Sequence, residues 1–332
     1  MKLSMMIPRN LHCSKRKDSM TKEPKASLSQ TIWYYRYFYL MLIPVLVWYI
    51  IFCYLPIYGV TLAFKSFHFN KGILGSPWIG LQNFRDLFVD AGFWTAFRNT
   101  LAISLGKLAF CFPMPILLAV LINEMSKRRL KKLYQTIFTF PHFVSWVVLS
   151  GIIINMFGQS GVYNQILSLF GAEANSPLLQ TDTFRPVLYV THIWKEAGWE
   201  SIIYLAALAG ISPELYEAAS IDGANRLQKM LHISWPGIRG TVTVLLILAV
   251  GQLMSGGGAM TGSSFDQIFN LYSSPVYEVA DTIDTFVYRI SFTIGANFGY
   301  VTAAGLVKSV INLVLLYTAN SVTKKIGESG LM

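Results

Sequence analysis

The chain has 332 residues, of which 53% are hydrophobic and only 13% are charged. This composition excludes an ordinary soluble domain and predicts a protein with several membrane spans. The formal net charge is +10, but most basic residues lie in short segments beside apolar runs, so the charge indicates membrane topology and no nucleic-acid partner. Cys13, Cys53 and Cys111 lack the spacing of a disulfide framework or a metal site, and no metal is expected.

Two N-terminal segments precede the main group of spans. Residues 1–30 are polar and basic without a long apolar run, which predicts a mobile basic cytoplasmic tail and no cleaved signal. Residues 31–95 are predicted to form the first transmembrane helix and an outer loop. The helix begins at aromatic residues around Trp33 and continues through the uncharged stretch between Arg36 and Lys65, and the loop contains a short interfacial helix.

Five further spans are predicted along the rest of the chain. The second runs from Asn99 to Asn123 with one charge at Lys107, and the basic cluster at residues 127–132 places its end in the cytoplasm. The others are predicted from Leu133 to Phe157 with a kink at Pro141, from Pro186 to Ile211, from Ile238 to Met254 and from Phe298 to Ala319, with a short helix from Val162 to Phe170 between two of them. Most lysines and arginines then lie on one side, which places both termini, including the tail 323–332, in the cytoplasm.

The loop between the fourth and fifth spans, residues 212–236, has the signals of a structured element. Ser212 and Pro213 predict a helix start, because serine caps helices and proline needs no partner for a missing N–H in the first turn. Glu214 and Glu217 are predicted in that first turn, where the helix dipole favours negative charge. The topology places this loop in the cytoplasm.

The second half of the loop contains a bend and another predicted helix. Asp222-Gly223 ends the first helix, since glycine readily takes positive φ. A second short helix is predicted from Ala224 to Ile233, stopped by Trp235-Pro236. The loop is therefore an elbow of two helices.

The elbow carries a specific motif. Glu217-Ala218-Ala219, Gly223, Ile233 and Pro236 have the spacing of the EAA motif, with Trp235 where the motif has leucine. The chain therefore resembles the membrane-spanning permease subunits of bacterial binding-protein-dependent ABC importers. The tripeptide alone would be no more than a good helix former. The resemblance implies that the elbow docks into a separate ATPase through Glu214, Glu217, Ala218, Ala219, Asp222, Gly223, Ile233 and Pro236.

The resemblance covers most of residues 33–331 and extends to the subgroup that imports oligosaccharides and polysaccharide fragments, a range that includes acidic ones derived from alginate or pectin. The runs from Ile193 to Trp199 and from Val279 to Tyr288 carry this similarity. The resemblance implies an all-α integral membrane protein with six transmembrane helices in a type I ABC importer (MetI-like) architecture. Residues 96–322 would form the permease core, with five of the helices and the coupling loop.

The partners follow from the same resemblance. It implies a multi-pass protein of the bacterial cytoplasmic (inner) membrane, in contact with lipid and with a second, non-identical permease. A cytoplasmic ABC ATPase dimer, an extracytoplasmic solute-binding protein and an oligosaccharide substrate complete the set. No cofactor is expected in this chain, because it lacks a Walker A pattern and ATP and Mg would be bound by the ATPase.

Polar residues within the spans are the candidates for the substrate path, because a charge at membrane depth costs at least about 2.5 kcal/mol unless it is paired or hydrated. In the fourth span one helix face carries His192, Lys195, Glu196 and Trp199, with Glu200 one turn beyond Glu196. This stripe would suit a sugar in a wet cavity, or it would pair with a neighbouring helix and fix packing; both remain open. Further candidates are Lys107, Lys308 and Asn312. The intramembrane lysines hint at an anionic substrate.

Two other classes of protein compete with an importer. A proton-coupled secondary transporter could use the intramembrane lysine and glutamate residues. An integral membrane glycan-processing enzyme would need clustered acid, base or metal-binding residues, yet the five histidines are scattered and catalytic residues are not expected. The Gly-rich segment 255–264 fits the family least, and is either a natural loop near the outer mouth or an inserted sequence.

Overall fold

The computed structural model describes residues 33–255, 265–292 and 297–325. Over these residues the chain is built from α, 3-10 and π helices, and its single β interaction is an isolated bridge between Lys65 and Trp78. The all-α prediction is therefore confirmed for this part of the chain. The predicted tail 1–30, residues 256–264 of the Gly-rich segment and residues 326–332 of the C-terminal tail lie outside the described residues.

Within the described residues, five helical segments are long and apolar enough to cross a membrane: Arg36–Phe64, Ala91–Asn123, Trp146–Leu169, Arg226–Gly251 and Phe298–Lys325. They correspond to the first, second, third, fifth and sixth predicted spans. The predicted fourth span is α11 (Thr181–Ala209), a helix of 29 residues. It is less apolar than the others because Lys195, Glu196 and Glu200 lie within it.

The part of the first span up to Tyr58 belongs to a compact unit of its own. This part consists of α2 (Arg36–Tyr49), the π-helix η1 (Ile50–Tyr54) and α3 (Leu55–Ile57), with exposed side chains along its length, and the span ends with the 3-10 helix η2 (Tyr58–Phe64). At its start the Arg36 guanidinium lies 4.5 Å from the ring centroid of Trp33. Such a cation on an aromatic side chain is typical of a membrane interface, as the sequence predicts.

The second span begins earlier than the predicted Asn99. It is one continuous segment made of α6 (Ala91–Gly106), the π-helix η4 (Lys107–Cys111) and α7 (Pro113–Asn123). Asp90 fixes the start, because its side chain accepts a hydrogen bond of 2.7 Å from the Gly92 N–H. The early start lengthens the helix on the side of the predicted outer loop, whose short helix is α5 (Gln82–Val89).

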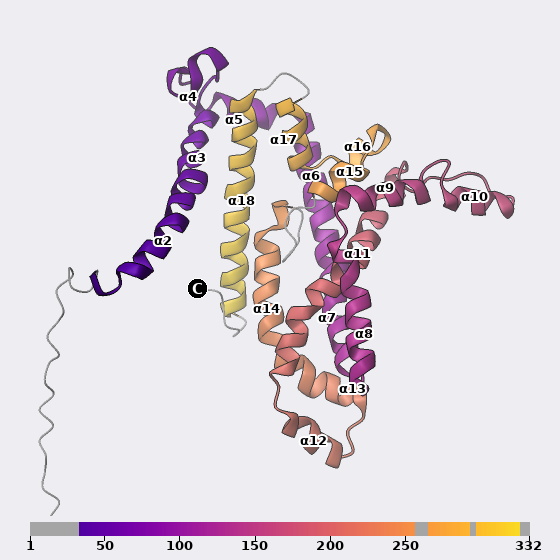
Figure 1. Ribbon diagram of the computed structural model, residues 1–332. Helices are drawn as coiled ribbons and strands as arrows, with labels where there is room; N and C mark the ends of the chain where they lie inside the picture. The colour runs from indigo at the N-terminus through magenta and orange to yellow at the C-terminus, as the bar shows by residue number, and fades with distance from the viewer. Residues whose placement is uncertain (1–32, 256–264, 293–296, 326–332) are drawn as a thin grey trace, which may run out of the picture. The chain divides into compact units, whose positions relative to one another are not determined.

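The prediction of one kinked span from Leu133 to Phe157 is wrong. The chain forms α8 (Arg128–Thr139), a 3-10 turn η5 (Phe140–Phe143) and α9 (Trp146–Phe157). Pro141 lies in the turn, where its missing N–H and its ring prevent α8 from continuing. Ser145 then caps α9 by accepting a hydrogen bond of 3.3 Å from the Val148 N–H. In Figure 1, α9 and α10 (Val162–Leu169) lie to the side of the main bundle.

The main bundle is held together around α11, which packs against α7, α8 and α14 (Trp235–Gly251). Gly198 permits the contact with α8, because a Cβ atom at this position would lie 2.0 Å from the carbonyl oxygen of Phe138. Apolar side chains from α7, α11 and α14 fill the space between the helices, among them the buried residues Tyr204, Leu208 and Ile238. One face of α11 is therefore buried against the other helices of the bundle, while residues such as Trp194 on it are exposed.

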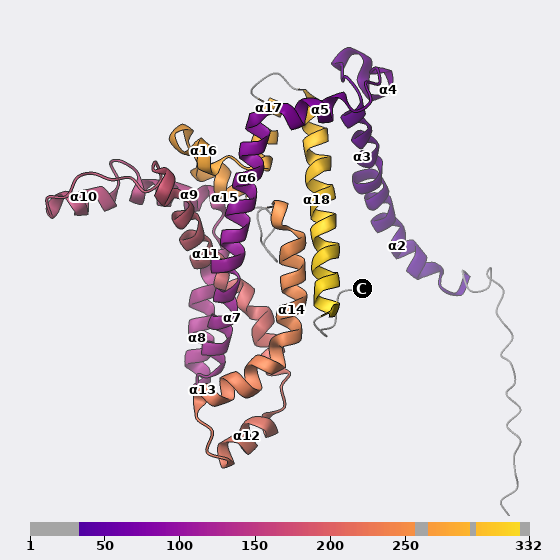
Figure 2. The same cartoon turned by 180° about the vertical axis from the view of Figure 1, so that it is seen from behind.

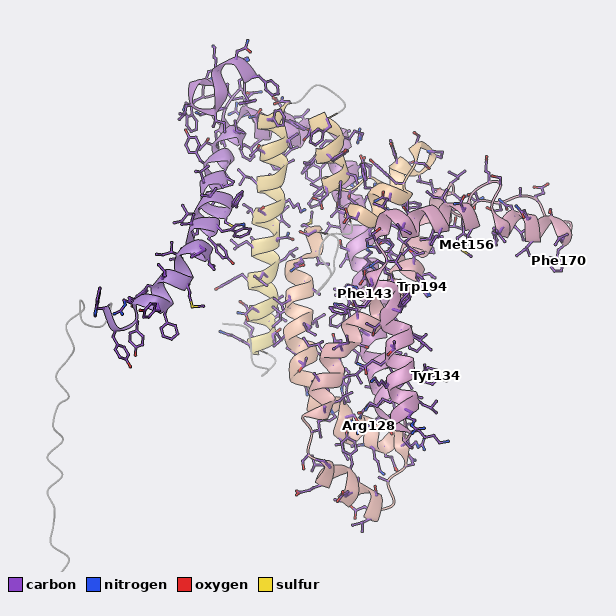
Figure 3. All side chains as sticks on the ribbon, viewed as in Figure 1. Arg128, Tyr134, Phe143, Met156, Phe170 and Trp194 are labelled. Carbon is purple, nitrogen blue, oxygen red and sulfur yellow. The ribbon has the colours of Figure 1, made fainter. Side chains whose placement is uncertain are left out.

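The remaining helices complete the bundle and form its two ends. Their bounds are α4 (Gly72–Gly75), α12 (Pro213–Ile221), α13 (Arg226–Lys229), α14 (Trp235–Gly251), α15 (Phe265–Leu271), α16 (Tyr277–Ala280), α17 (Ile283–Phe292) and α18 (Phe298–Lys325). Figures 1 and 2 show α12 at one end and α5 and α17 at the opposite end. Large apolar side chains such as Tyr134, Phe143 and Trp194 are exposed on the outside (Figure 3), which suits contact with lipid or with another subunit.

Candidate functional site

The first helix of the elbow is α12, with Pro213 in its first turn and Ser212 at the N-cap position. The Ser212 side chain makes no capping hydrogen bond, so the helix start rests on backbone geometry and the proline. Glu214 lies in the first turn as predicted, but the placement of Glu217 there is wrong, because it is the fifth residue of α12 and one turn is about 3.6 residues. Both carboxylates are exposed at the end of the bundle.

Gly223 forms the bend that follows α12. Its φ is +76°, the left-handed conformation that the sequence predicts, and no heavy atom lies within 4 Å of an ideal Cβ position there. The constraint at this position is therefore the backbone angle and not the space for a side chain. The Ala224 N–H donates 2.8 Å back to the Ala219 carbonyl oxygen, which closes the end of α12.

The second helix of the elbow differs from the prediction. Asn225 starts it with a capping box, in which its side chain and that of Gln228 each bond the other residue's backbone N–H. The helix does not stop at Trp235-Pro236, since α13, the π-helix η6 (Met230–Ser234) and α14 form one segment from Arg226 to Gly251. The wider π turn just before Pro236 accommodates the proline, whose ring would otherwise disturb an α-helix. The fifth span thus starts inside the elbow.

Two side-chain hydrogen bonds fix the helices of the elbow to each other. The hydroxyl groups of Tyr216 and Ser234 lie 2.9 Å apart, and Lys229 Nζ donates 2.7 Å to Ser220 Oγ. A shallow cavity of about 270 Å³ lies between the helices, lined by residues that include Asp222, Gly223 and Ile233. The two helices of the elbow are therefore linked by side chains and leave a hollow between them. Ala218 and Pro236 are exposed, and Ala219 is half-buried.

The polar stripe of α11 forms a buried charge cluster with a residue from η5. Lys195 Nζ lies 2.7 Å from Glu196 Oε1 and donates 2.8 Å to the His142 carbonyl oxygen. Glu196 Oε2 lies 2.6 Å from His142 Nδ1. The side chains of Lys195 and Glu196 are only 6% and 3% exposed. Of the two alternatives left open by the sequence, the structure contains the packing contact: Lys195 and Glu196 pair with each other, and both contact His142 outside α11.

Trp199 extends this cluster toward accessible space. Its indole ring stacks on the His142 imidazole with 4.3 Å between ring centroids and 4° between the ring planes. Phe143 approaches the same indole edge-on at 5.8 Å. Trp199 and Glu200 are half-buried, in contrast to the buried Lys195 and Glu196, so an aromatic face remains close to the charge cluster.

Lys107 and His192 belong to a second buried cluster. Lys107 Nζ donates 2.7 Å to Gln267 Oε1 and lies 3.4 Å from His192 Nδ1. Gln267 Nε2 in turn donates to the Leu188 carbonyl oxygen at 2.8 Å and to Thr191 Oγ1 at 3.0 Å. These bonds hold α15 against η4 and α11. The Lys107 ammonium thus contacts polar groups from both α15 and α11.

The last two candidates are on α18. Lys308 forms an ion pair with Asp284 of α17. Asn312 Oδ1 accepts a hydrogen bond of 3.0 Å from the Met254 N–H, and its Nδ2 donates 3.2 Å to Ser255 Oγ. Asn312 of α18 therefore binds the residues that directly follow α14. The sequence does not identify Asp284, Gln267 and His142 as partners, since no local spacing links them to the charges they contact.

The described residues contain no group of three or more His, Cys, Asp or Glu side chains that could hold a metal ion. The membrane helices, the buried polar clusters and the exposed elbow with EAA spacing define a membrane permease of the ABC importer type. The family described as "Binding-protein-dependent transport system inner membrane component" matches residues 112–327. The chain belongs to this family, so it is a multi-pass transport subunit of the inner membrane, and the predicted resemblance is confirmed.

Individual relatives match over nearly the whole chain. The Polygalacturonan/rhamnogalacturonan transport system permease protein YteP of Bacillus subtilis (strain 168) is 40% identical over 313 residues, which cover 93% of this chain and 94% of that protein. Protein LplB of the same organism is 41% identical over 89% of this chain and 91% of its own length. A crystal structure of a bacterial alginate ABC transporter in complex with alginate pentasaccharide-bound periplasmic protein contains a chain with 38% identity and a TM-score of 0.81. The structural match covers 92% of this chain and 99% of the transporter chain.

Proposed function

We propose that this chain is one of two permease subunits of an ATP-driven importer of acidic oligosaccharides, such as those derived from pectin or alginate. The elbow carries the proposal, because α12, the bend at Gly223 and the capped helix after it present the EAA-spaced residues at an exposed end of the bundle. The similarity to a permease named for polygalacturonan and rhamnogalacturonan and to an alginate transporter supports an acidic substrate.

The proposed topology has six spans. It adds α11 to the five apolar segments, since its 29 residues exceed the roughly twenty that a span needs and its central charges are paired within the chain. An even number of spans places both termini on the same side. The elbow lies on that side, the cytoplasm, and α5 and α17 lie at the extracytoplasmic end.

The proposed partners divide between these two ends. An ATPase dimer that holds ATP and Mg docks on the elbow, where Glu214 and Glu217 offer exposed negative charge and Leu215 and Ile221 offer exposed apolar surface. An extracytoplasmic binding protein delivers the oligosaccharide at the opposite end. A second, non-identical permease completes the path.

The proposed path passes the half-buried edge of the α11 stripe. Trp199 and Glu200 are the accessible members of this stripe, whereas Lys195 and Glu196 hold each other and His142 in place. A sugar can pack its apolar face on an aromatic ring while its hydroxyl groups bind polar side chains. Lys107 and His192 are buried beside α11 and stabilise its position, Lys107 through its hydrogen bond to Gln267.

Uptake by proteoliposomes tests the proposal. The chain is co-purified with its second permease and its ATPase, the binding protein is added outside, and labelled oligogalacturonates are supplied with and without internal ATP. We expect uptake that requires ATP and the binding protein. Uptake by this chain alone under a proton gradient would favour a secondary transporter, and ATP-driven uptake restricted to neutral sugars would contradict the acidic substrate.

A further inference from the structure

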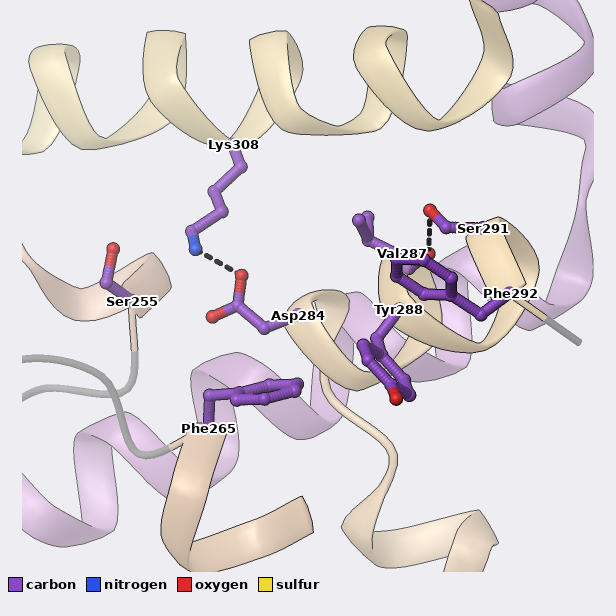
Figure 4. A pocket seen from close by; sticks show the side chains of 8 residues that line it. All are labelled: Ser255, Phe265, Asp284, Val287, Tyr288, Ser291, Phe292 and Lys308. Carbon is purple, nitrogen blue, oxygen red and sulfur yellow. Dashed lines mark hydrogen bonds and ion pairs between the residues drawn. The ribbon is translucent and has the colours of Figure 1, made fainter. Parts of the chain in front are cut away.

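A cavity of about 530 Å³ lies among α15, α17 and α18 (Figure 4). Aromatic side chains form one wall: the ring centroids of Phe265 and Tyr288 are 5.7 Å apart, and those of Tyr288 and Phe292 are 5.0 Å apart. Phe269 stacks on Phe265 at 5.1 Å and supports this wall. The volume falls within the range of about 300 to 1,000 Å³ that is typical of ligand sites.

The ion pair between Lys308 and Asp284 also lines this cavity. Figure 4 shows the two side chains reaching toward each other, one from α18 and the other from the start of α17. Their side chains are 18% and 27% exposed, so both are accessible from the cavity. Among the described residues, Asp284 is the acceptor that Lys308 Nζ contacts. An ammonium group has three donors, and the others can therefore bind a ligand.

This ion pair can exchange partners at low cost. A partly exposed pair is weaker than a fully buried one, because water can replace either partner. Asp284 also lies in the first turn of α17, where the helix N-terminus stabilises its negative charge when Lys308 turns away. The Lys195–Glu196 pair differs, because its side chains are 6% and 3% exposed and Glu196 also binds His142.

We propose that this cavity is a subsite for a uronate unit of the transported oligosaccharide, which rests on the function proposed above. The uronate carboxylate takes the place of Asp284 at Lys308, in a charge-assisted hydrogen bond. The sugar ring lies on the wall of Phe265, Tyr288 and Phe292. The hydroxyl of Ser255, which also lines the cavity, accepts a hydrogen bond from Asn312 and can donate its own proton to a sugar hydroxyl.

The test compares Lys308→Gln and Asp284→Asn in the complete transporter. Proteoliposomes receive an oligogalacturonate and its methyl ester of the same length, which differ in charge but share their rings and hydroxyls. We expect Lys308→Gln to lower the ratio of acid to ester uptake about tenfold, the effect of losing about 1.4 kcal/mol. Asp284→Asn is expected to raise this ratio, because Lys308 then has no competing carboxylate. Expressing both as a ratio to wild type cancels any selectivity of the binding protein.

Two further variants separate the subsite from other effects. Asp266→Asn removes the same charge from the exposed first turn of α15, outside the cavity, and is expected to leave the ratio unchanged. Tyr288→Leu is expected to reduce uptake of both sugars equally, since ring packing does not distinguish acid from ester.

The outcomes distinguish the subsite from the proposed function. If both ion-pair variants lower acid and ester uptake by the same factor, Lys308 and Asp284 are a packing pair and the subsite is refuted. Wild-type ratios in both variants would also refute it. If the wild-type transporter takes up neither sugar, the proposed acidic-oligosaccharide import fails, and with it the subsite that rests on it.

Discussion

The buried cluster on α11 predicts strong coupling between Lys195 and Glu196. Their closest atoms are 2.7 Å apart in a site where the two side chains are 6% and 3% exposed. Lys195→Met removes the cation and leaves the Glu196 carboxylate buried with His142 as its neighbour. Breaking a buried pair by removing one partner costs about 3 to 5 kcal/mol. The double variant Lys195→Met/Glu196→Gln removes both charges, and we expect it to regain most of this loss.

The assay is thermal unfolding of the purified complex at one scan rate, because large assemblies commonly unfold irreversibly. We expect each single variant to lower the midpoint and the double variant to lie nearer to wild type. Asp182→Asn is the matched control, since this carboxylate is exposed in the first turn of the same helix and its loss should change stability by no more than about 0.5 kcal/mol.

Additive effects of the two single variants would refute the coupling. Wild-type midpoints in both, together with normal uptake, would show that the pair neither holds the helices nor serves transport. If the double variant is as stable as wild type but transports poorly, the two charges serve the substrate path, because its helix packing would then be intact.

Three other predictions concern the elbow and the helix contacts. Glu217→Arg should release the ATPase or uncouple hydrolysis from uptake while membrane insertion persists, because truncating a desolvated interfacial charge costs about 2 to 5 kcal/mol and reversal adds repulsion; co-purification of the ATPase measures this. Gly223→Val should weaken ATPase retention through a cost of about 1 to 2 kcal/mol for the left-handed backbone, whereas Gly223→Asn should be tolerated. Gly198→Ala should reduce the stability of the complex by about 1 to 3 kcal/mol and so lower the unfolding midpoint, because its Cβ would lie 2.0 Å from the Phe138 carbonyl oxygen. Gly151→Ala is the control, since no heavy atom lies within 4 Å of the added Cβ. ATPase retention unaffected by Glu217→Arg, equal retention in the valine and asparagine variants of Gly223, or equal midpoints in the two alanine variants would contradict the corresponding prediction.

The elbow could be predicted from the sequence because its signals are local. A proline in the first turn and a glycine at a left-handed position each act within a few residues of the feature they determine. The end of the second helix could not be predicted in the same way. Proline normally stops a helix, and the π turn from Met230 to Ser234 that accommodates Pro236 has no comparable local signal.

The partners of the charges inside the spans could not be predicted either. Glu196 and His142 are 54 positions apart, and Lys107 and Gln267 are 160 positions apart. Such pairs form only once the helices pack, so helix periodicity identifies the polar face but not what it meets. Pro141 is involved in two errors, the wrong end of α8 and the missing partner of Glu196. The 3-10 turn that replaces the predicted kink also places His142 beside Glu196.

The same packing suggests a route by which a force on the elbow reaches the proposed substrate path. α11, which carries the charge cluster, ends at Ala209, and α12 begins only a few residues later at Pro213. The connection is tight, because a Cβ at Gly237 would lie 2.3 Å from Ile211 Cδ1, and the Tyr216–Ser234 hydrogen bond ties α12 to the start of the fifth span. We therefore expect a displacement of α12 to be passed to both α11 and α14. Close-packed helices transmit such a shift as rigid elements, so we expect the polar face of α11 to move with the elbow.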